Sequence, residues 1–331
     1  MAFSEQYFKS PGKDNFMKKY FIGIDLGGTF IKGGIVEDTG AIIEIDKTPT
    51  EVNKGNLRIC ENIAALTERL IERANIDRAQ IVGIGMGTPG MIDTKSGILK
   101  CAENLLIECF PIADELKKLT GFNVVVANDA NVATLGEVKF GAAKNKQNAI
   151  MITLGTGVGG GMVCNGVLVE GNEGAGAELG HTVIAMGGEL CSCGRRGCAE
   201  AYASATALIR ETKKAMKNHK DSKMWSIGDI EAVDGKTVFD FADSDVYAKE
   251  VLDNYIYALA TIIVNFANIF RPDAIILGGG ICAQGENLTT PLQKIVNEEI
   301  YGGELGPQVP VLTASLGNTA GVLGAAALLM D

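Results

Sequence analysis

Positive charge and histidine are both scarce in this chain. Thirty lysines and arginines stand against forty aspartates and glutamates, which gives a net charge of −10 at pH 7. Proteins that bind nucleic acids neutralise phosphate groups with lysine and arginine, so we do not expect DNA or RNA as a partner. The only two histidines are His181, which has cysteines downstream, and His219, which lies in a polar run typical of a solvated surface.

Long apolar segments are also missing. No run of about eighteen uncharged apolar residues occurs, and the N-terminus lacks the basic and then apolar pattern of a signal peptide. We therefore expect a cytoplasmic protein that does not interact with membranes. Because thiols stay reduced in the cytoplasm, the eight cysteines are not expected to form a disulfide framework.

The N-terminal half contains a regular succession of strands. Residues 1–17 are polar and unpatterned, and we interpret them as a tag or a disordered extension. Three β-rich runs follow at 20–25, 30–36 and 41–45, and after a helical stretch comes a buried strand at 81–87. The pattern predicts three strands, a helix and a further strand.

The same pattern begins again at Ala149. An apolar strand, a Gly/Thr turn, a second strand, an Asn-Gly turn and a third strand follow one another. An amphipathic helix is predicted at about 246–270, where Pro272 stops it before a strand that runs into a glycine turn at 274–280. The chain is thus interpreted as an internally duplicated α/β protein.

Length and pattern together predict two domains. We expect an N-terminal α/β domain at 18–135 and a C-terminal α/β domain at 136–316, which carries the cysteine-rich loop. A C-terminal helix at about 317–331 is expected to return to the first domain.

Glycine is abundant, with 42 residues, and much of it follows predicted strands. A glycine turn lets backbone N–H groups approach a phosphate closely. Three such turns, at 27–29, 155–157 and 278–280, predict a nucleotide site, although a tight hairpin without a ligand is the alternative for each. The P-loop pattern does not occur, and we interpret none of the turns as the GxGxxG of a Rossmann unit with its acid about twenty residues on, so we expect a nucleotide site of another kind.

Two aspartates follow predicted strands. Asp25 lies beside the first glycine turn, where its carboxylate can hold the water of Mg²⁺ while the turn holds phosphate. Asp129 lies where a short strand at 124–127 gives way to a helix, and open α/β sheets bind ligands at the carboxyl ends of strands. Helix capping is the alternative role for Asp129, whereas the adjacent Asn128 favours a site for hydroxyl groups.

Three cysteines occur within eight positions. Cys191, Cys193 and Cys198 follow His181, and a set of three cysteines and one histidine suits a tetrahedral Zn²⁺ ion. Four protein ligands leave no open coordination position, so we expect the zinc to be structural. A redox-active cysteine cluster is the alternative, but two glycines within the loop favour a tight metal-binding turn.

Two carboxylates accompany this loop. Glu178 precedes His181 by three residues, and Glu200 follows the last cysteine by two. Carboxylates that a metal does not need are free to accept hydrogen bonds from the hydroxyl groups of a sugar. With a nucleotide turn and an aspartate base, they predict phosphorylation of a sugar.

Seven motifs together resemble the ROK family of repressors and kinases, and within it the bacterial kinases of glucose. They are DLGGT at 25–29, TPG at 88–90, NDAN at 128–131, LGTGVGGG at 154–161, ELGH at 178–181, CSCGRRGCAE at 191–200 and LGGG at 277–280. The resemblance extends from about Lys18 to the C-terminus. It implies an actin-like ATPase fold of the RNase H-like or hexokinase type, with two α/β domains and an interdomain cleft for sugar and ATP.

The resemblance also implies roles for residues. Asp129 is expected to be the catalytic base. The residues expected to contact the sugar are Asn104, Asn128, Asp129, Glu178, His181 and Glu200, and those expected to serve Mg-ATP are Asp25, Gly27, Gly28, Thr29, Thr156, Gly157, Gly279 and Gly280. His181 would bind zinc through one ring nitrogen and sugar through the other.

The activity implied is ATP-dependent phosphorylation of a hexose, with glucose to glucose 6-phosphate as the leading expectation. Kinases for fructose, mannose, N-acetylmannosamine or N-acetylglucosamine are alternatives, as is a sugar-sensing regulator, which the presence of Asp25 and Asp129 disfavours. The segment after Asn104 departs from the family, which usually has a tryptophan where this chain has Cys109 and Phe110. The family resemblance favours a homodimer or a dimer of dimers.

Overall fold

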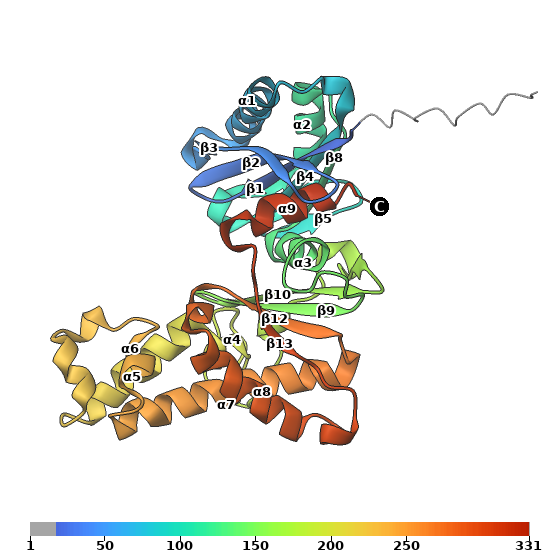
Figure 1. Cartoon of the computed structure of the whole chain (residues 1–331). Helices are drawn as coiled ribbons and strands as arrows, with labels where there is room; N and C mark the ends of the chain where they lie inside the picture. Colours follow the sequence, from blue (N-terminus) through green and yellow to red (C-terminus); the bar gives the residue numbers. More distant parts are fainter. Residues whose placement is uncertain (1–17, 331) are drawn as a thin grey trace, which may run out of the picture.

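Two five-stranded sheets form the framework of the protein (Figure 1). The structure is a computed structural model and describes residues 18–330. The expected tag or extension at 1–17 lies outside the described residues.

The first sheet has the strand order β3-β2-β1-β4-β8. β1, β2 and β3 are antiparallel neighbours, whereas β4 and β8 run parallel to β1. Isoleucines and leucines of these strands and of the helices on them form one buried core. The elements are β1 (Tyr20–Leu26), β2 (Phe30–Glu37), β3 (Ile42–Pro49), α1 (Asn56–Ala74), β4 (Ile81–Thr88), α2 (Ile112–Thr120) and β8 (Val124–Asn128).

The second sheet repeats this arrangement in the order β11-β10-β9-β12-β13. Three antiparallel strands are again followed by two parallel ones. Its elements are β9 (Ala149–Leu154), β10 (Val158–Cys164), β11 (Val167–Leu168), α4 (Glu200–Ala203), α5 (Ala205–Asn218), α6 (Thr237–Phe241), α7 (Val246–Phe270), β12 (Ala274–Gly278), α8 (Glu286–Glu299) and β13 (Val311–Thr313).

The ends of the long helix α7 are set by residues of the local sequence. Asp245 caps its N-terminus by accepting hydrogen bonds from the backbone N–H groups of Tyr247 and Ala248. At its C-terminus Arg271 adopts a left-handed conformation with φ of 42°, directly before Pro272. The apolar face between these ends is buried in the core of the second sheet.

A small third sheet extends from the first domain toward the second. It consists of β5 (Met91–Asp93), β6 (Ile98–Ala102) and β7 (Ile107–Phe110). The Thr94 hydroxyl, at the tip of the β5–β6 hairpin, donates a hydrogen bond of 3.1 Å to Glu170 of the second domain. The hairpin thus lies close to the segment that follows β11.

The last helix, α9 (Ala320–Ala327), returns the chain to the first sheet (Figure 1). It packs against β1 and against α3 (Asp129–Lys139), the helix that follows β8. Glycine permits this contact, because a Cβ on Gly324 would come within 1.8 Å of the carbonyl oxygen of Val132. The expected domain boundary between 135 and 136 falls inside α3.

Among residues 18–330, no helix combines the length and the apolar character needed to cross a membrane.

Candidate active site between the two sheets

A cavity of about 810 Å³ lies between the two sheets. Of the residues singled out from the sequence, its walls contain Asp25, Asp129, Gly279 and Gly280. The expected sugar-binding residues other than Asp129 do not line this cavity. The structure thus brings together, in one cleft, the two aspartates and the third glycine turn.

Asp25 lies in β1 directly opposite Lys32 of β2. The Nζ atom of Lys32 is 3.5 Å from an oxygen of Asp25, and both side chains are partly exposed to the cavity. Sequence reasoning missed Lys32. The signal was present, because a hairpin that turns at 27–29 places residues 25 and 32 on neighbouring strands.

Asp129 is the first residue of α3, and its neighbour is the cap of that helix. The Oδ1 atom of Asn128 accepts hydrogen bonds from the backbone N–H groups of Ala130 (2.9 Å) and Asn131 (3.3 Å). The N-cap is therefore Asn128, although the N–H group of Ala130 also donates a hydrogen bond of 2.8 Å to Oδ1 of Asp129. The Nδ2 atom of Asn128 lies 3.4 Å from the carbonyl oxygen of Gly90.

The environment of Asp129 favours the protonated carboxyl relative to water. Its side chain is open to solvent within the cleft, yet the surrounding protein removes part of its hydration, and this desolvation raises its pKa above the ordinary 3.8. The negative charge of Asp25 raises the pKa further, while the N–H group of Ala130 opposes the shift. A raised pKa brings a carboxylate closer to the range in which a general base works at neutral pH.

The first glycine turn, at 27–29, is held by hydrogen bonds from the residue that follows β3. The Thr50 hydroxyl donates a hydrogen bond of 2.6 Å to the carbonyl oxygen of Gly27, and its backbone N–H donates one of 2.9 Å to that of Thr29. Gly28 lies beside Asn104, since a Cβ on Gly28 would be 3.2 Å from the Asn104 carbonyl oxygen. This turn and a residue expected to bind sugar are therefore neighbours.

The second glycine turn is held by the start of α5. Ala205 N–H donates a 2.9 Å hydrogen bond to the carbonyl oxygen of Gly155, and the Thr206 hydroxyl donates one of 2.8 Å to that of Thr156. Gly157 is in contact with Glu200, because a Cβ on Gly157 would be 2.3 Å from the Oε2 atom. A larger residue at position 157 would require the Glu200 carboxylate to move.

The cysteine-rich loop forms a cluster of metal-binding atoms. One ligand atom from each of His181, Cys191, Cys193 and Cys198 lies within 4.8 Å of the others. The sulfurs of Cys193 and Cys198 are 3.8 Å apart, and the Cys191 sulfur is 3.6 Å from Nδ1 of His181. Bonds of about 2.3 Å from zinc to sulfur give sulfur pairs about 3.8 Å apart in a tetrahedron. The residues therefore fit a zinc ion, with Nδ1 as the histidine ligand atom.

Glu200 joins this loop to the second glycine turn. Its Oε1 atom accepts a 2.7 Å hydrogen bond from the Ser192 hydroxyl, and its Oε2 atom accepts one of 3.1 Å from Val158 N–H. Burial alone would raise the pKa of the Glu200 carboxyl, but these hydrogen bonds outweigh burial and lower it. Glu178, the other expected carboxylate, is exposed just before the single helical turn that ends at His181.

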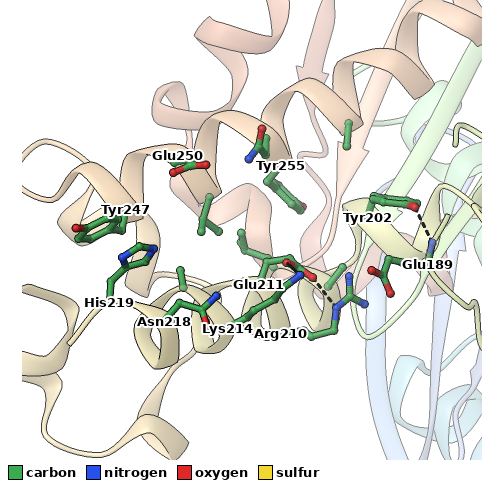
Figure 2. A pocket seen from close by; sticks show the side chains of 16 residues that line it. Glu189, Tyr202, Arg210, Glu211, Lys214, Asn218, His219, Tyr247, Glu250 and Tyr255 are labelled. Carbon is green, nitrogen blue, oxygen red and sulfur yellow. Dashed lines mark hydrogen bonds and ion pairs between the residues drawn. The ribbon is translucent and has the colours of Figure 1, made fainter. Parts of the chain in front are cut away.

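A second cavity, of about 420 Å³, lies between α5 and α7 (Figure 2). His219 stacks on Tyr247 there, with ring centroids 3.7 Å apart. The two cations on its wall, Arg210 and Lys214, are both paired with Glu211. It contains none of the residues expected to act on sugar or ATP, so the cleft remains the candidate active site.

The repeated sheets and the cleft between them define an actin-like ATPase of the hexokinase type. The chain belongs to the ROK family, since the family model matches residues 21–331.

Bacterial glucokinases are similar to this chain over nearly their whole length. The glucokinase of Thermotoga maritima is 39% identical over 317 residues, which cover 95% of this chain and 98% of the relative. That of Halalkalibacterium halodurans is 38% identical over 310 residues, 92% of this chain and 93% of the relative. A regulator is similar as well: the xylose repressor of Bacillus spizizenii is 29% identical over 326 residues, 96% of this chain and 79% of the repressor.

A solved structure shares the fold and contains ligands. The crystal structure of a ROK family glucokinase from Streptomyces griseus, in complex with glucose and AMPPNP, matches with a TM-score of 0.74 and 34% identity. The match covers 93% of this chain and 98% of that chain.

Proposed function

We propose that this protein is a glucokinase, which transfers the γ-phosphoryl group of ATP to the 6-hydroxyl group of glucose. The observation that carries the proposal is Asp129, a carboxylate with a raised pKa on the wall of the interdomain cavity. The similarity to glucokinases, including one in complex with glucose and an ATP analogue, supports both substrates.

Asp129 would accept the proton of the sugar hydroxyl as that oxygen attacks the γ-phosphorus. Asp129 lies directly after β8 on the wall of the cavity, and the N–H group of Ala130 holds its Oδ1 atom at 2.8 Å. A base in this position removes the proton that would otherwise build up positive charge on the attacking oxygen.

The glycine turns and Asp25 would bind Mg-ATP. Thr29, Thr156 and the glycines at 27, 28, 157, 279 and 280 present backbone groups to the phosphates and along the nucleotide. Asp25 would hold magnesium through water, and that ion would neutralise charge on the phosphates. Lys32, which contacts Asp25, adds a positive charge on the same wall.

The cysteine-rich loop would hold a structural zinc ion beside the sugar. His181 contacts Cys191 through Nδ1, which leaves Nε2 for the substrate. We assign the remaining sugar contacts to Asn104, Asn128, Glu178 and Glu200. Glu200 already accepts hydrogen bonds from Ser192 and Val158, so its carboxylate is fixed before sugar binds.

A sugar-sensing regulator is the second candidate. The similarity to a xylose repressor favours it, because that relative shares most of this chain's length. Such a protein would bind sugar without turnover, and the aspartates at 25 and 129 would then have no catalytic use.

A coupled assay of ADP formation over a panel of hexoses tests the proposal. We expect turnover with ATP and glucose, and lower kcat/KM with fructose, mannose, N-acetylmannosamine and N-acetylglucosamine, since a moved or replaced hydroxyl group leaves polar groups of the site unpaired. A higher kcat/KM with another of these sugars would identify that sugar as the substrate instead of glucose. Sugar binding by calorimetry without ADP formation would support the regulator instead.

We further propose a cytoplasmic homodimer, or a dimer of such dimers, as the family resemblance implies. Light scattering of the purified protein gives its mass in solution, which tests the oligomeric state.

The two domains would divide along residues 140–148 and 314–319, where the chain passes between the sheets.

A further inference from the structure

Glu137 is a buried carboxylate that the mechanism above does not use. It lies near the C-terminal end of α3, and its side chain is completely buried. Its Oε1 atom accepts hydrogen bonds from the backbone N–H groups of Ser315 (2.9 Å) and Leu316 (2.8 Å). Its Oε2 atom accepts them from the N–H group of Ala142 (2.8 Å) and from the Ser315 hydroxyl (3.2 Å). Both oxygens of one carboxylate are thus bound by neutral donors.

These donors belong to two different segments that join the domains. The chain leaves α3 for the second sheet along residues 140–148, which contain Ala142, and it returns from β13 to α9 along residues 314–319, which contain Ser315. One side chain therefore binds both interdomain connections at the same point. Nothing in the local sequence indicates this, because Ser315 is 178 positions away from Glu137.

The surroundings of Glu137 leave the carboxylate little freedom. A Cβ on Gly141 would come within 2.0 Å of Oε2, so the first connection approaches the carboxylate more closely than a larger residue allows. The helix that carries Glu137 contacts both domains, since Val132 packs with Ala325 of α9 and Val138 packs in a cluster with Met151 of β9. α3 is accordingly the helix between the domains.

We propose that Glu137 is a positioning residue of the interdomain hinge. By binding both connections it fixes the point about which the cleft closes. Asp129 lies on the same helix, so the hinge also sets the distance from Asp129 to the glycine turns of the second domain. This role goes beyond the transfer reaction and depends on the fold rather than on the identity of the sugar.

The variant Glu137→Gln tests the role in the full-length protein. Glutamine has the same size, but its NH₂ group must face one of the N–H donors, so one connection loses its acceptor. We expect faster hydrogen exchange at the amides of residues 142, 315 and 316 without any ligand. We also expect kcat/KM for glucose and for ATP to fall together, by about ten- to a hundredfold, because the reacting groups are misplaced.

Asp245→Asn is the matched control. Asp245 is also buried and also accepts hydrogen bonds from a hydroxyl and backbone amides, those of Ser222, Tyr247 and Ala248, but all lie within the second domain. It should lower the melting temperature while leaving kcat/KM and exchange at 314–319 unchanged. Ser315→Ala, which removes only the hydroxyl donor, should fold normally and change exchange and kcat/KM in the same direction as Glu137→Gln by a smaller amount.

Small-angle X-ray scattering with and without glucose and AMPPNP measures closure directly. The decrease in the radius of gyration on binding should be smaller in Glu137→Gln than in the wild type and in Asp245→Asn. Exchange, closure and kcat/KM equal to those of Asp245→Asn would overturn the hinge role. Because exchange is measured without ligand, it tests the hinge even if the protein is not a glucokinase.

Discussion

We assign separate tasks to two adjacent residues at the start of α3, and one substitution tests this assignment. Asn128 caps the helix, so Asp129→Asn should leave the helix intact. An amide cannot take the proton of the sugar hydroxyl, and we expect kcat to fall by about 10²–10⁴-fold. The coupled assay measures kcat, while calorimetry with glucose and the melting temperature show that binding and folding persist.

Asn128→Ala is the companion variant. Loss of the cap should lower the free energy of unfolding by about 1 kcal/mol, which Asp129→Asn should not do. Turnover close to that of the wild type in Asp129→Asn would contradict the assignment of the base.

The pKa of Asp129 gives a prediction about pH. Since the base must be ionised, kcat/KM should decrease as the pH falls through the pKa of Asp129, which lies above 3.8. Asp25→Asn removes a neighbouring negative charge, which favours the ionised carboxylate, so the pKa of Asp129 should decrease in this variant. Carboxyl ¹³C NMR titration of the protein without ligand measures the shift. Asp93→Asn, in the β5–β6 hairpin, is the control and should leave the pKa of Asp129 unchanged, whereas no change in Asp25→Asn would mean that the two aspartates do not interact.

At this scale the sequence predicted where strands give way to helices better than it predicted individual hydrogen bonds. It indicated the strand-to-helix junction at 128–129, but asparagine and aspartate are equally good caps. Only the structure shows that Asn128 is the cap and that the N–H group of Ala130 contacts both side chains. Lys32 and Glu137 escaped notice because their significance depends on partners across a hairpin or across the whole chain.

In the proposed function, the cysteine-rich loop is the element on which sugar recognition depends. Because a closed metal site contributes folding free energy, Cys193→Ser should lower both the zinc content and the melting temperature. Elemental analysis of the wild type should give about one zinc per chain, as expected for a closed set of four ligands. Cys164→Ser, which changes an exposed cysteine of β10, is the control and should alter neither quantity. A wild-type protein that is as stable and as active without zinc as with it would contradict the structural role of the metal.

Glu178 and Glu200 should differ in their effects although both accompany the loop. Glu178→Gln should raise the KM for glucose about ten- to a hundredfold and leave that for ATP unchanged, because a charged acceptor of a sugar hydroxyl is lost. Glu200→Gln should raise both KM values, since Glu200 also binds Val158 beside the second glycine turn. Initial rates over a grid of both substrates separate these cases. A higher KM for ATP alone in Glu178→Gln would contradict the placement of Glu178 beside the sugar.

At the scale of the whole molecule, the sequence predicted the repeated architecture well. The restart at Ala149 anticipated the shared strand order, and the helix expected at about 246–270 is observed as Val246–Phe270. Periodicity and turn residues are local features of the sequence, and such features are sufficient to predict strands, helices and their order. They could not show that the β5–β6 hairpin reaches Glu170, because that contact depends on how distant segments pack.

The return of α9 to the first sheet has a consequence for how the protein is made. The N-terminus emerges from the ribosome first, yet Gly23 in β1 packs directly on the backbone of Val322 in α9. The first domain to be synthesised therefore receives α9 only after the strands of the second sheet have been translated. Until then β1 and β4 keep an uncovered surface, whereas the second sheet already has all of its strands once β13 has emerged. During translation the domain that starts later is thus the one that can finish folding earlier.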